Sequence, residues 1–379
     1  MIRKIAVLRA NALGDFIFVL PALQALRETF PEAEIVYLGR DWHKQFLKGR
    51  PSPVDRVIVV PPYQGISESE GFVPDPDVLD AFFAEMQKEE FDLAFQLHGG
   101  GRNSNPFVLR LGAKTTIGLK TPDAADLDIS VPYVYYHSEI LRYLEVVAKV
   151  GAVTAAIEPS VTVTKTDLDE AKRILGNFNR NETIVIHPGA SDLRRRWPPE
   201  NFAAIADFMA ETGFTVYLSG MPFERDHLDA IESSVQHRSK VHNLCGKLPL
   251  DATTGLLSAS RLLISNDTGP LHLARAVKTP TVGIYWCGNI VTGLPVTAGI
   301  HRPLLSFAIN CPLCGLSSKH FGKANDRGPC KHETSFVADV TVDEVKTAIE
   351  ELLELQHLKS AELNFTQSSK VTLEKEEAS

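Results

Sequence analysis

Short apolar runs alternate with stretches of helical periodicity along the first half of the chain. Four runs predict buried strands: Lys4–Leu8, Glu34–Leu38, Arg56–Val60 and Asp92–Leu97. Between the first two, apolar residues recur at roughly helical spacing: Leu20, Leu23, Leu26 and Phe30. Further helices are expected around residues 76–89 and 137–150. Strands separated by helices indicate a parallel sheet covered on both faces.

The same alternation starts again near residue 180. Strands are predicted at Glu182–His187, Phe214–Leu218, Leu262–Ser265 and Thr281–Tyr285, and helices at Asn201–Thr212 and Arg225–Ser234. The chain is therefore expected to be an α/β protein with two Rossmann-like parallel-sheet domains that face each other across a cleft. We expect these domains to span residues 1–165 and 166–356. Residues 357–379 are polar without a periodic apolar face, which is typical of a disordered tail.

Composition narrows the functional classes. The chain has 379 residues, 44% of them hydrophobic and 23% charged, as in ordinary globular proteins. Its formal net charge of -8 argues against nucleic acid as a partner. No apolar run approaches the ~18–20 residues of a transmembrane helix, and the N-terminus lacks the pattern of a signal peptide. We expect a cytoplasmic protein, with peripheral contact at the inner face of the cytoplasmic membrane left open.

Four polar loops follow predicted strands, at the end of a parallel sheet where ligands bind. The first contains Asn11, Gly14 and Asp15. Gly14 permits a tight turn or a close backbone approach. Asp15 lies near a helix start, so it is either a first-turn acid that complements the helix dipole or a general base. Pro21 leaves the helix boundary open, because it either kinks the helix or marks its first turn.

The second and third loops carry candidate groups for a nucleotide. His187-Pro-Gly-Ala-Ser191 ends in small residues that expose backbone N–H groups, and Arg194-Arg-Arg196 adds bidentate donors. This combination favours phosphate binding over a solvated basic loop. In the third loop, Ser219–Arg225, Glu224 either hydrogen-bonds a ribose hydroxyl or belongs to the first turn of a helix.

The fourth loop reads Ser-Asn-Asp-Thr-Gly-Pro-Leu-His from position 265. Asp267, Thr268 and Gly269 lie where a helix is expected to begin, with a proline at its first position. A helix N-terminus attracts anions, and His272 falls within the first turn. An N-cap with a core-facing histidine is the alternative, but a nucleotide-diphosphate site explains more of these residues at once.

In this order the motifs resemble the signatures of glycosyltransferase family 9, the ADP-heptose:lipopolysaccharide heptosyltransferases and their relatives. The resemblance covers roughly residues 1–350 and rests on Ala12-Leu-Gly-Asp15 with Leu20-Pro-Ala-Leu23, His187-Pro-Gly-Ala-Ser191, Arg195-Arg-Trp-Pro198 and Ser265–His272. It implies a GT-B architecture with the acceptor mostly on the N-terminal domain and the nucleotide-sugar on the C-terminal one. It also implies an inverting transfer that requires no cofactor for catalysis.

The resemblance further implies roles for individual residues. Asp15 would be the general base. The donor would contact Ser191, Arg195, Glu224, Asp267, Thr268, Gly269 and His272. The family commonly has lysine where this chain has Arg195, and a phosphate contact survives that change. The donor would be ADP-heptose by family default, and the acceptor a glycan or a lipid-linked glycan.

The acceptor would meet Asn11, Gly14 and Arg102. The segment Leu97–Arg102 could place backbone amides and Arg102 on the acceptor, or it could be a simple glycine-rich turn. Two other functional classes stay open. A nucleotide-sugar 2-epimerase would convert free sugar nucleotide without an acceptor, and a non-catalytic nucleotide-sugar-binding protein would not need Asp15 as a base.

A cysteine cluster forms a separate motif. Cys311 and Cys314 make a CxxC pair, and Cys330 with His332 makes a Cys-x-His pair downstream. This spacing suits a structural Cys3His zinc site, and cytosolic thiols favour a metal over a disulfide. The intervening segment is rich in Gly and Lys, which argues against the site. The two remaining cysteines are expected to be small buried hydrophobes.

Overall fold

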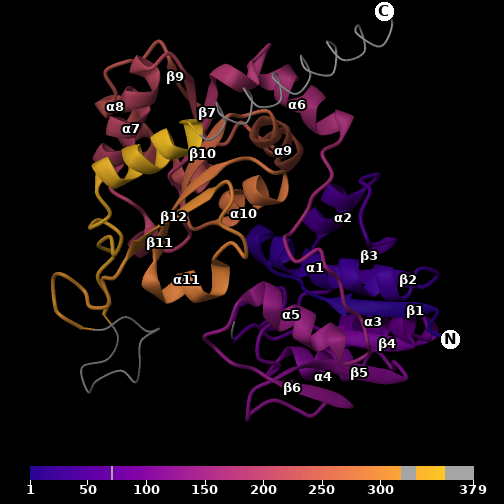
Figure 1. Cartoon of the computed structure of the whole chain (residues 1–379). Helices are drawn as coiled ribbons and strands as arrows, with labels where there is room; N and C mark the ends of the chain where they lie inside the picture. Colours follow the sequence, from indigo (N-terminus) through magenta and orange to yellow (C-terminus); the bar gives the residue numbers. More distant parts are fainter. Residues whose placement is uncertain (70, 317–329, 355–379) are drawn as a thin grey trace, which may run out of the picture.

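The computed structural model describes residues 1–69, 71–316 and 330–354, which form two lobes (Figure 1). Each lobe is built on a six-stranded parallel sheet, with strand orders β3-β2-β1-β4-β5-β6 and β12-β11-β10-β7-β8-β9. Starting from β7, the second order repeats the first one, and both are the Rossmann arrangement. The strand order therefore reverses between β1 and β4 in one lobe and between β7 and β10 in the other.

The strands of the first lobe are β1 (Lys4–Leu8), β2 (Glu34–Gly39), β3 (Arg56–Val59), β4 (Leu93–Gln96), β5 (Thr115–Lys120) and β6 (Ile129–Pro132). Those of the second lobe are β7 (Thr183–His187), β8 (Thr215–Leu218), β9 (Val241–Asn243), β10 (Leu262–Asn266), β11 (Thr281–Trp286) and β12 (His301–Ser306). All eight strands predicted from the sequence are present. The α/β class with two Rossmann-like parallel sheets is therefore confirmed.

The helices of the first lobe are α1 (Leu13–Thr29), α2 (Asp41–Leu47), α3 (Pro76–Lys88), α4 (Ser104–Leu109) and α5 (Glu139–Ala148). The labelled α-helices that follow are α6 (Lys165–Leu175), α7 (Pro199–Glu211), α8 (Arg225–Ser234), α9 (Leu250–Ser258), α10 (Gly269–Ala276) and α11 (Cys287–Gly293), and residues 342–354 are also helical. Pro21 lies inside α1, so it does not mark the first turn. The tail expected at residues 357–379 lies outside the described residues.

The central strands of both sheets are buried, as parallel strands covered on both faces must be. One apolar cluster continues from the first lobe into the second through α1 and α10, which lie side by side (Figure 1). Within it, Leu20 and Leu23 of α1 belong to the same cluster as Leu271 and Leu273 of α10. The lobes are thus packed together at the carboxyl ends of their central strands. No helix in the described ranges is both long enough and apolar enough to cross a bilayer.

A buried ion pair ties the lobes together a second time. Arg50, which follows α2, donates two hydrogen bonds to the Asp167 carboxylate of α6, at 2.6 and 2.7 Å. The same guanidinium donates to the carbonyl of Thr162 in the connection between the lobes. The side chains of Arg50 and Asp167 are 4% and 0% exposed. Because both charges are buried, each depends on its partner.

We expect Asp167→Ala to lower the free energy of unfolding by about 3 kcal/mol, since it leaves the Arg50 charge buried without its main partner. Equilibrium denaturation measures this change. Asp169→Ala on the same helix is the control, because Asp169 pairs with Lys165 at the exposed surface and should matter by less than ~1 kcal/mol. Equal effects of the two substitutions would contradict the assignment.

Candidate active site

The loops after β1, β4, β7 and β10 meet at the contact between the lobes. Two glycines make the approach of α1 and α10 close. A Cβ on Gly14 would lie 3.0 Å from Cδ2 of His272, and a Cβ on Gly269 would lie 3.0 Å from Cβ of Leu13. The ring of Phe18 on α1 lies against the His272 ring, with 4.5 Å between centroids. The N-termini of the two helices therefore lie next to each other across the interface.

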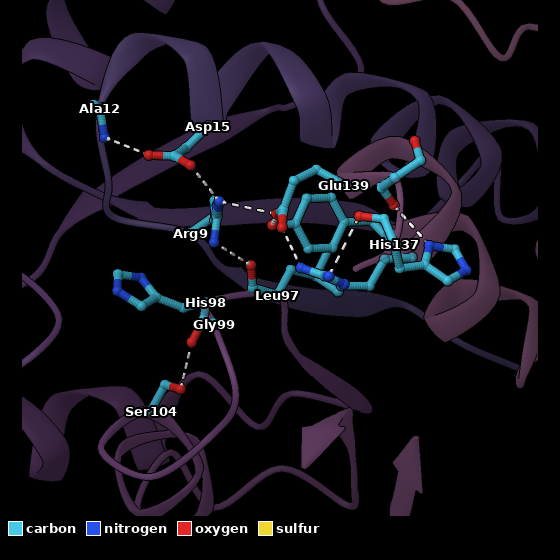
Figure 2. Close-up of polar contacts among 12 residues, drawn as sticks. Arg9, Ala12, Asp15, Leu97, His98, Gly99, Ser104, His137 and Glu139 are labelled. Carbon is cyan, nitrogen blue, oxygen red and sulfur yellow. Dashed lines mark hydrogen bonds and ion pairs between the residues drawn. The ribbon is translucent and has the colours of Figure 1, made fainter. Parts of the chain in front are cut away.

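Asp15 lies in the first turn of α1, at the rim of this interface. Arg9 donates to its Oδ1 at 2.6 Å, and the backbone N–H of Ala12 donates to its Oδ2 at 3.2 Å (Figure 2). Arg9 also donates to the carbonyl of Leu97 at 3.0 Å. Its side chain is 4% exposed, whereas that of Asp15 is 33% exposed. The Asp15 carboxylate is therefore fixed in orientation by a buried cation but remains open to a ligand.

Glu139, at the start of α5, is a second carboxylate beside Arg9, with 3.4 Å between its Oε2 and the guanidinium (Figure 2). Arg142 and the hydroxyl of Tyr143 also donate to Glu139. Burial lowers the pKa of Arg9, but the charges of Tyr143, Asp15 and Glu139 outweigh it and raise that pKa above its usual value. Glu139 thus stabilises the cation that positions Asp15.

The loop after β4 contacts the same cluster. His98 accepts a hydrogen bond from the backbone N–H of Ala10 at 3.2 Å, and burial lowers the pKa of His98 to about 3. Gln96 donates to the carbonyls of His98 and Gly99, so its side chain connects β4 to the glycine-rich turn. Arg102 extends from this turn to the surface, where it lies 3.8 Å from Asp123. A contact between Arg102 and the acceptor stays a prediction.

The three consecutive arginines of the second lobe have different partners. Arg194 forms a bidentate pair with Asp192, at 2.9 and 2.6 Å, and Arg196 donates to the carbonyl of Ala190. Arg195 alone of the three links the loop after β7 to the loop after β10, donating to Ser191 Oγ at 3.1 Å and to the carbonyl of Asp267 at 3.2 Å. Arg195 is therefore the arginine positioned for an anion near the start of α10.

Asp267 and His272 form a buried pair beside Arg195. His272 Nε2 lies 3.1 Å from Asp267 Oδ1, and Asn289 donates to Oδ2 at 3.1 Å. Arg275 lies 3.1 Å from His272 Nδ1. A guanidinium can only donate, so Nδ1 accepts and the ring proton is assigned to Nε2, facing Asp267. Burial lowers the pKa of His272 although Asp267 opposes the shift. A lowered pKa favours the neutral form of the ring.

The N-terminus of α10 contributes a free polar atom. Thr268 is its N-cap residue, but its side chain makes no capping hydrogen bond. Its Oγ1 is buried and has no hydrogen-bond partner among the residues that the structure describes. Because a buried polar atom without a partner is costly, this hydroxyl and the adjacent N–H groups of α10 are suited to a bound anion.

Glu224 lies beneath the second candidate loop. A Cβ on Gly189 would come within 2.0 Å of the Glu224 carboxylate, so only glycine fits there. Glu224 accepts a hydrogen bond from the backbone N–H of Met221 at 2.8 Å, and burial raises its pKa. Asn266 connects the loops, donating to the carbonyl of Pro188 and accepting from the N–H of Trp197.

Apart from Arg102 and the metal-binding candidates, the predicted site residues thus fall into two groups. Those assigned to the donor surround the start of α10 and the loop after β7, while Asp15, Gly14 and Asn11 lie on the facing end of α1. Sequence reasoning missed Arg9, Glu139 and Asn289. Arg9 directly follows β1 and could have been suspected from that position, whereas nothing near Glu139 in the sequence links it to Asp15.

The arrangement suits a group transfer from a phosphate. One lobe presents an oriented carboxylate that a ligand can reach. The other presents a guanidinium, a helix N-terminus and a hydroxyl without a partner, which are groups that stabilise negative charge on a leaving phosphate. In such a transfer the carboxylate would accept a proton from the attacking group. The anion site would bind the leaving phosphate on the opposite side of the reacting atom.

Comparisons with known proteins point to the glycosyltransferases. Residues 80–296 match the family model described as glycosyltransferase family 9 (heptosyltransferase). Lipooligosaccharide heptosyltransferase 2 of Haemophilus ducreyi is 23% identical, over 92% of this chain and 99% of that protein. Two solved structures have the same fold, which is that of GT-B heptosyltransferases.

The first structure is ADP-heptose lps heptosyltransferase II of E. coli, with a TM-score of 0.72 and 17% identity over 94% of this chain and 99% of that chain. The second is the E. coli heptosyltransferase WaaC with ADP-2-deoxy-2-fluoro heptose, with a TM-score of 0.62 and 18% identity over 92% of this chain and 99% of that chain. The GT-B architecture expected from the sequence is therefore confirmed.

His187, at the end of β7, should make the fold sensitive to acid. Burial lowers its pKa from about 6.5 to about 4 in the folded protein, where it pairs with Ser219. The unfolded chain therefore binds a proton more readily, and stability is lost as the pH falls from 6.5 to 4, by about 3 kcal/mol for this group. His187→Asn should flatten this dependence in denaturation curves recorded across that range. The exposed His242→Asn should not, and an unchanged slope in His187→Asn would contradict the assignment.

Proposed function

This chain belongs to glycosyltransferase family 9, and from that membership we propose that it transfers heptose from ADP-heptose to a lipopolysaccharide-type acceptor, with inversion and with Asp15 as the general base. One observation carries the proposal. The oriented carboxylate of Asp15 on one lobe faces an anion-binding helix N-terminus on the other, with Gly14 and Gly269 at the contact. The ADP-heptose analogue bound by the similar WaaC structure supports the choice of donor.

The second lobe binds the donor in this proposal. Arg195 and Ser191 hold the diphosphate together with the Gly269 N–H and the Thr268 hydroxyl, which has no other partner among the described residues. Glu224 binds the ribose, since it lies directly beneath the loop after β7. The positive end of α10 then stabilises the charge that develops on the diphosphate as the sugar leaves.

Asp267 orients the donor site. Its carboxylate lies 3.7 Å from Arg195 and its carbonyl accepts a hydrogen bond from the same guanidinium, which directs Arg195 toward Ser191. Burial disfavours the charge of Asp267, but His272, Arg195 and Asn289 outweigh it and lower its pKa. The neutral His272 ring then separates this carboxylate from α1 and forms the wall next to the transferred sugar.

Asp15 carries out the proton transfer. Its carboxylate removes the proton from the acceptor hydroxyl while that oxygen bonds to the anomeric carbon of the sugar. The bond from this carbon to the phosphate oxygen breaks on the opposite face, and ADP leaves with the electron pair. A single displacement of this kind inverts the anomeric configuration. Arg9 holds Asp15 in one position throughout, so little reorganisation accompanies the reaction.

The acceptor enters from the first lobe. Residues 134–137 flank Glu139, and Arg142 holds them by hydrogen bonds to the carbonyls of Val134 and Tyr135. The rings of Tyr135 and Tyr136 are about half exposed, so they offer apolar faces on which a sugar can pack. Asn11, Gly14 and Arg102 complete this side. A lipid-linked acceptor would bring the enzyme to the inner face of the cytoplasmic membrane.

The test is a transfer assay with purified protein, ADP-heptose and a heptose-deficient lipopolysaccharide acceptor. We expect release of ADP and a gain of one heptose in the mass of the acceptor, with an inverted anomeric linkage. Calorimetry with ADP, UDP, GDP and dTDP tests the donor base separately. Tighter binding of a nucleotide other than ADP would overturn the donor assignment. Change of the free sugar nucleotide without transfer would overturn the reaction.

Asp15→Asn should lower kcat by about 10²–10⁴-fold, because the amide cannot accept the proton, and should leave the affinity for ADP nearly unchanged. Steady-state kinetics and calorimetry measure the two effects. Asp41→Asn is the matched control, since Asp41 is also a first-turn acid but begins α2 and pairs with Gln45. A variant at position 15 with normal kcat would rule out this base.

Arg195→Ala should weaken ADP binding by about 10–100-fold, since a charge-assisted hydrogen bond contributes about 1.5–3 kcal/mol. Calorimetric titration with ADP measures this loss. Arg194→Ala removes a neighbouring charge that Asp192 already neutralises, so it should weaken binding much less. If Arg194→Ala were the more damaging substitution, the phosphate contact would be misassigned.

A further inference from the structure

The cysteine motif of the second lobe forms a compact cluster separate from the candidate active site. Cys311 and Cys314 follow β12, and Cys330 and His332 return to the same place in space. One ligand atom from each of the four residues lies within 4.8 Å of all the others. Three sulfurs and one imidazole nitrogen are therefore gathered at a single point, although the pairs are far apart in the sequence.

The separations match those around a metal ion and not those of a disulfide. Cys314 Sγ lies 3.5 Å from Cys330 Sγ, far beyond the ~2.05 Å of a sulfur–sulfur bond. His332 Nδ1 lies 3.6 Å from Cys311 Sγ and 3.5 Å from Cys330 Sγ. Tetrahedral zinc with ordinary bond lengths separates two sulfurs by roughly 3.8 Å and a sulfur from a nitrogen by roughly 3.6 Å.

The backbone around the cluster is also arranged for thiolates. Gly315 directly follows the CxxC pair with φ of 70°, a conformation that favours glycine, and its N–H donates to the carbonyl of Cys311 at 2.8 Å. The N–H of His332 lies 3.3 Å from Cys330 Sγ and donates to it. The His332 N–H would stabilise the negative charge of a metal-bound Cys330 sulfur and orient it.

We propose that Cys311, Cys314, Cys330 and His332 bind one structural zinc ion, through three thiolates and Nδ1 of the imidazole. Zinc favours thiolate and imidazole together in a tetrahedral site, which supports the choice of this ion. Four protein ligands fill the coordination shell and leave no position for a substrate or a water molecule. The ion therefore has a structural role and takes no part in the transfer reaction.

The proposed zinc site would hold in place the segment around Phe336, which contacts the loop after β7. Cys311 and Cys330 are buried in the same apolar cluster as Phe336, whose N–H donates to the carbonyl of Arg194 at 2.7 Å. Ser306 at the end of β12 donates to the carbonyl of Phe336. The ion thus links β12 to the chain that supports residues 193–195. This role would hold whether or not the proposed transfer is correct.

The test is metal analysis of the full-length protein, purified without a metal-affinity tag and dialysed against a chelator. We expect one zinc per chain in the wild type. Cys314→Ser should lose it to the chelator, and because Cys314 is exposed the substitution opens no cavity. Cys330→Ser should lose it as well. Cys287→Ser is the matched control and should keep one equivalent, since Cys287 lies in α11 outside the cluster.

A second readout needs no variant. Modification of the wild-type thiols with a mercurial reagent should release the zinc as the cluster cysteines react, and a colorimetric indicator follows this release. A wild type that holds no zinc and takes up none from one added equivalent would overturn the proposal. Zinc retained at one equivalent in both cluster variants would do so too. One equivalent of iron in place of zinc would overturn the identity of the ion.

Discussion

The close contact between the N-termini of α1 and α10 is the constraint on which the site depends. Gly14 and Gly269 let the two helices approach closely, so two positive helix ends lie near each other. Such a contact is unfavourable unless negative charge lies beside it. Asp15 and Asp267 supply part of this charge, and a diphosphate at the start of α10 would supply more. The same geometry thus holds the lobes together and creates an anion site.

Each lobe contributes a carboxylate held by an arginine, yet the two pairs differ in a way that suits different tasks. Arg9 is almost fully buried and holds Asp15 from the protein interior, so part of the carboxylate remains exposed. Arg195 is more exposed and Asp267 is buried, so there the guanidinium has the open side. The two lobes therefore present an accessible carboxylate and a more exposed guanidinium.

How well each strand could be predicted from the sequence depends on how deeply that strand is buried. The strands foreseen from the sequence include the central ones, such as β1 and β10, whose continuous apolar runs reflect cover on both faces. The strands that were missed are β5, β6, β9 and β12, and three of them carry polar or partly exposed residues. β5 reads Thr115–Lys120 with a glycine inside, a weak strand signal that only its place between β4 and β6 overrides.

By itself the sequence determined the two Rossmann halves, the close approach at Gly14 and the candidate loops, because these depend on local patterns. Only the tertiary structure decided that Glu139 supports Arg9 from 130 positions away. It also decided that the four metal-binding candidates share one point in space. Contacts between distant segments depend on how the lobes pack, and no local pattern carries that information.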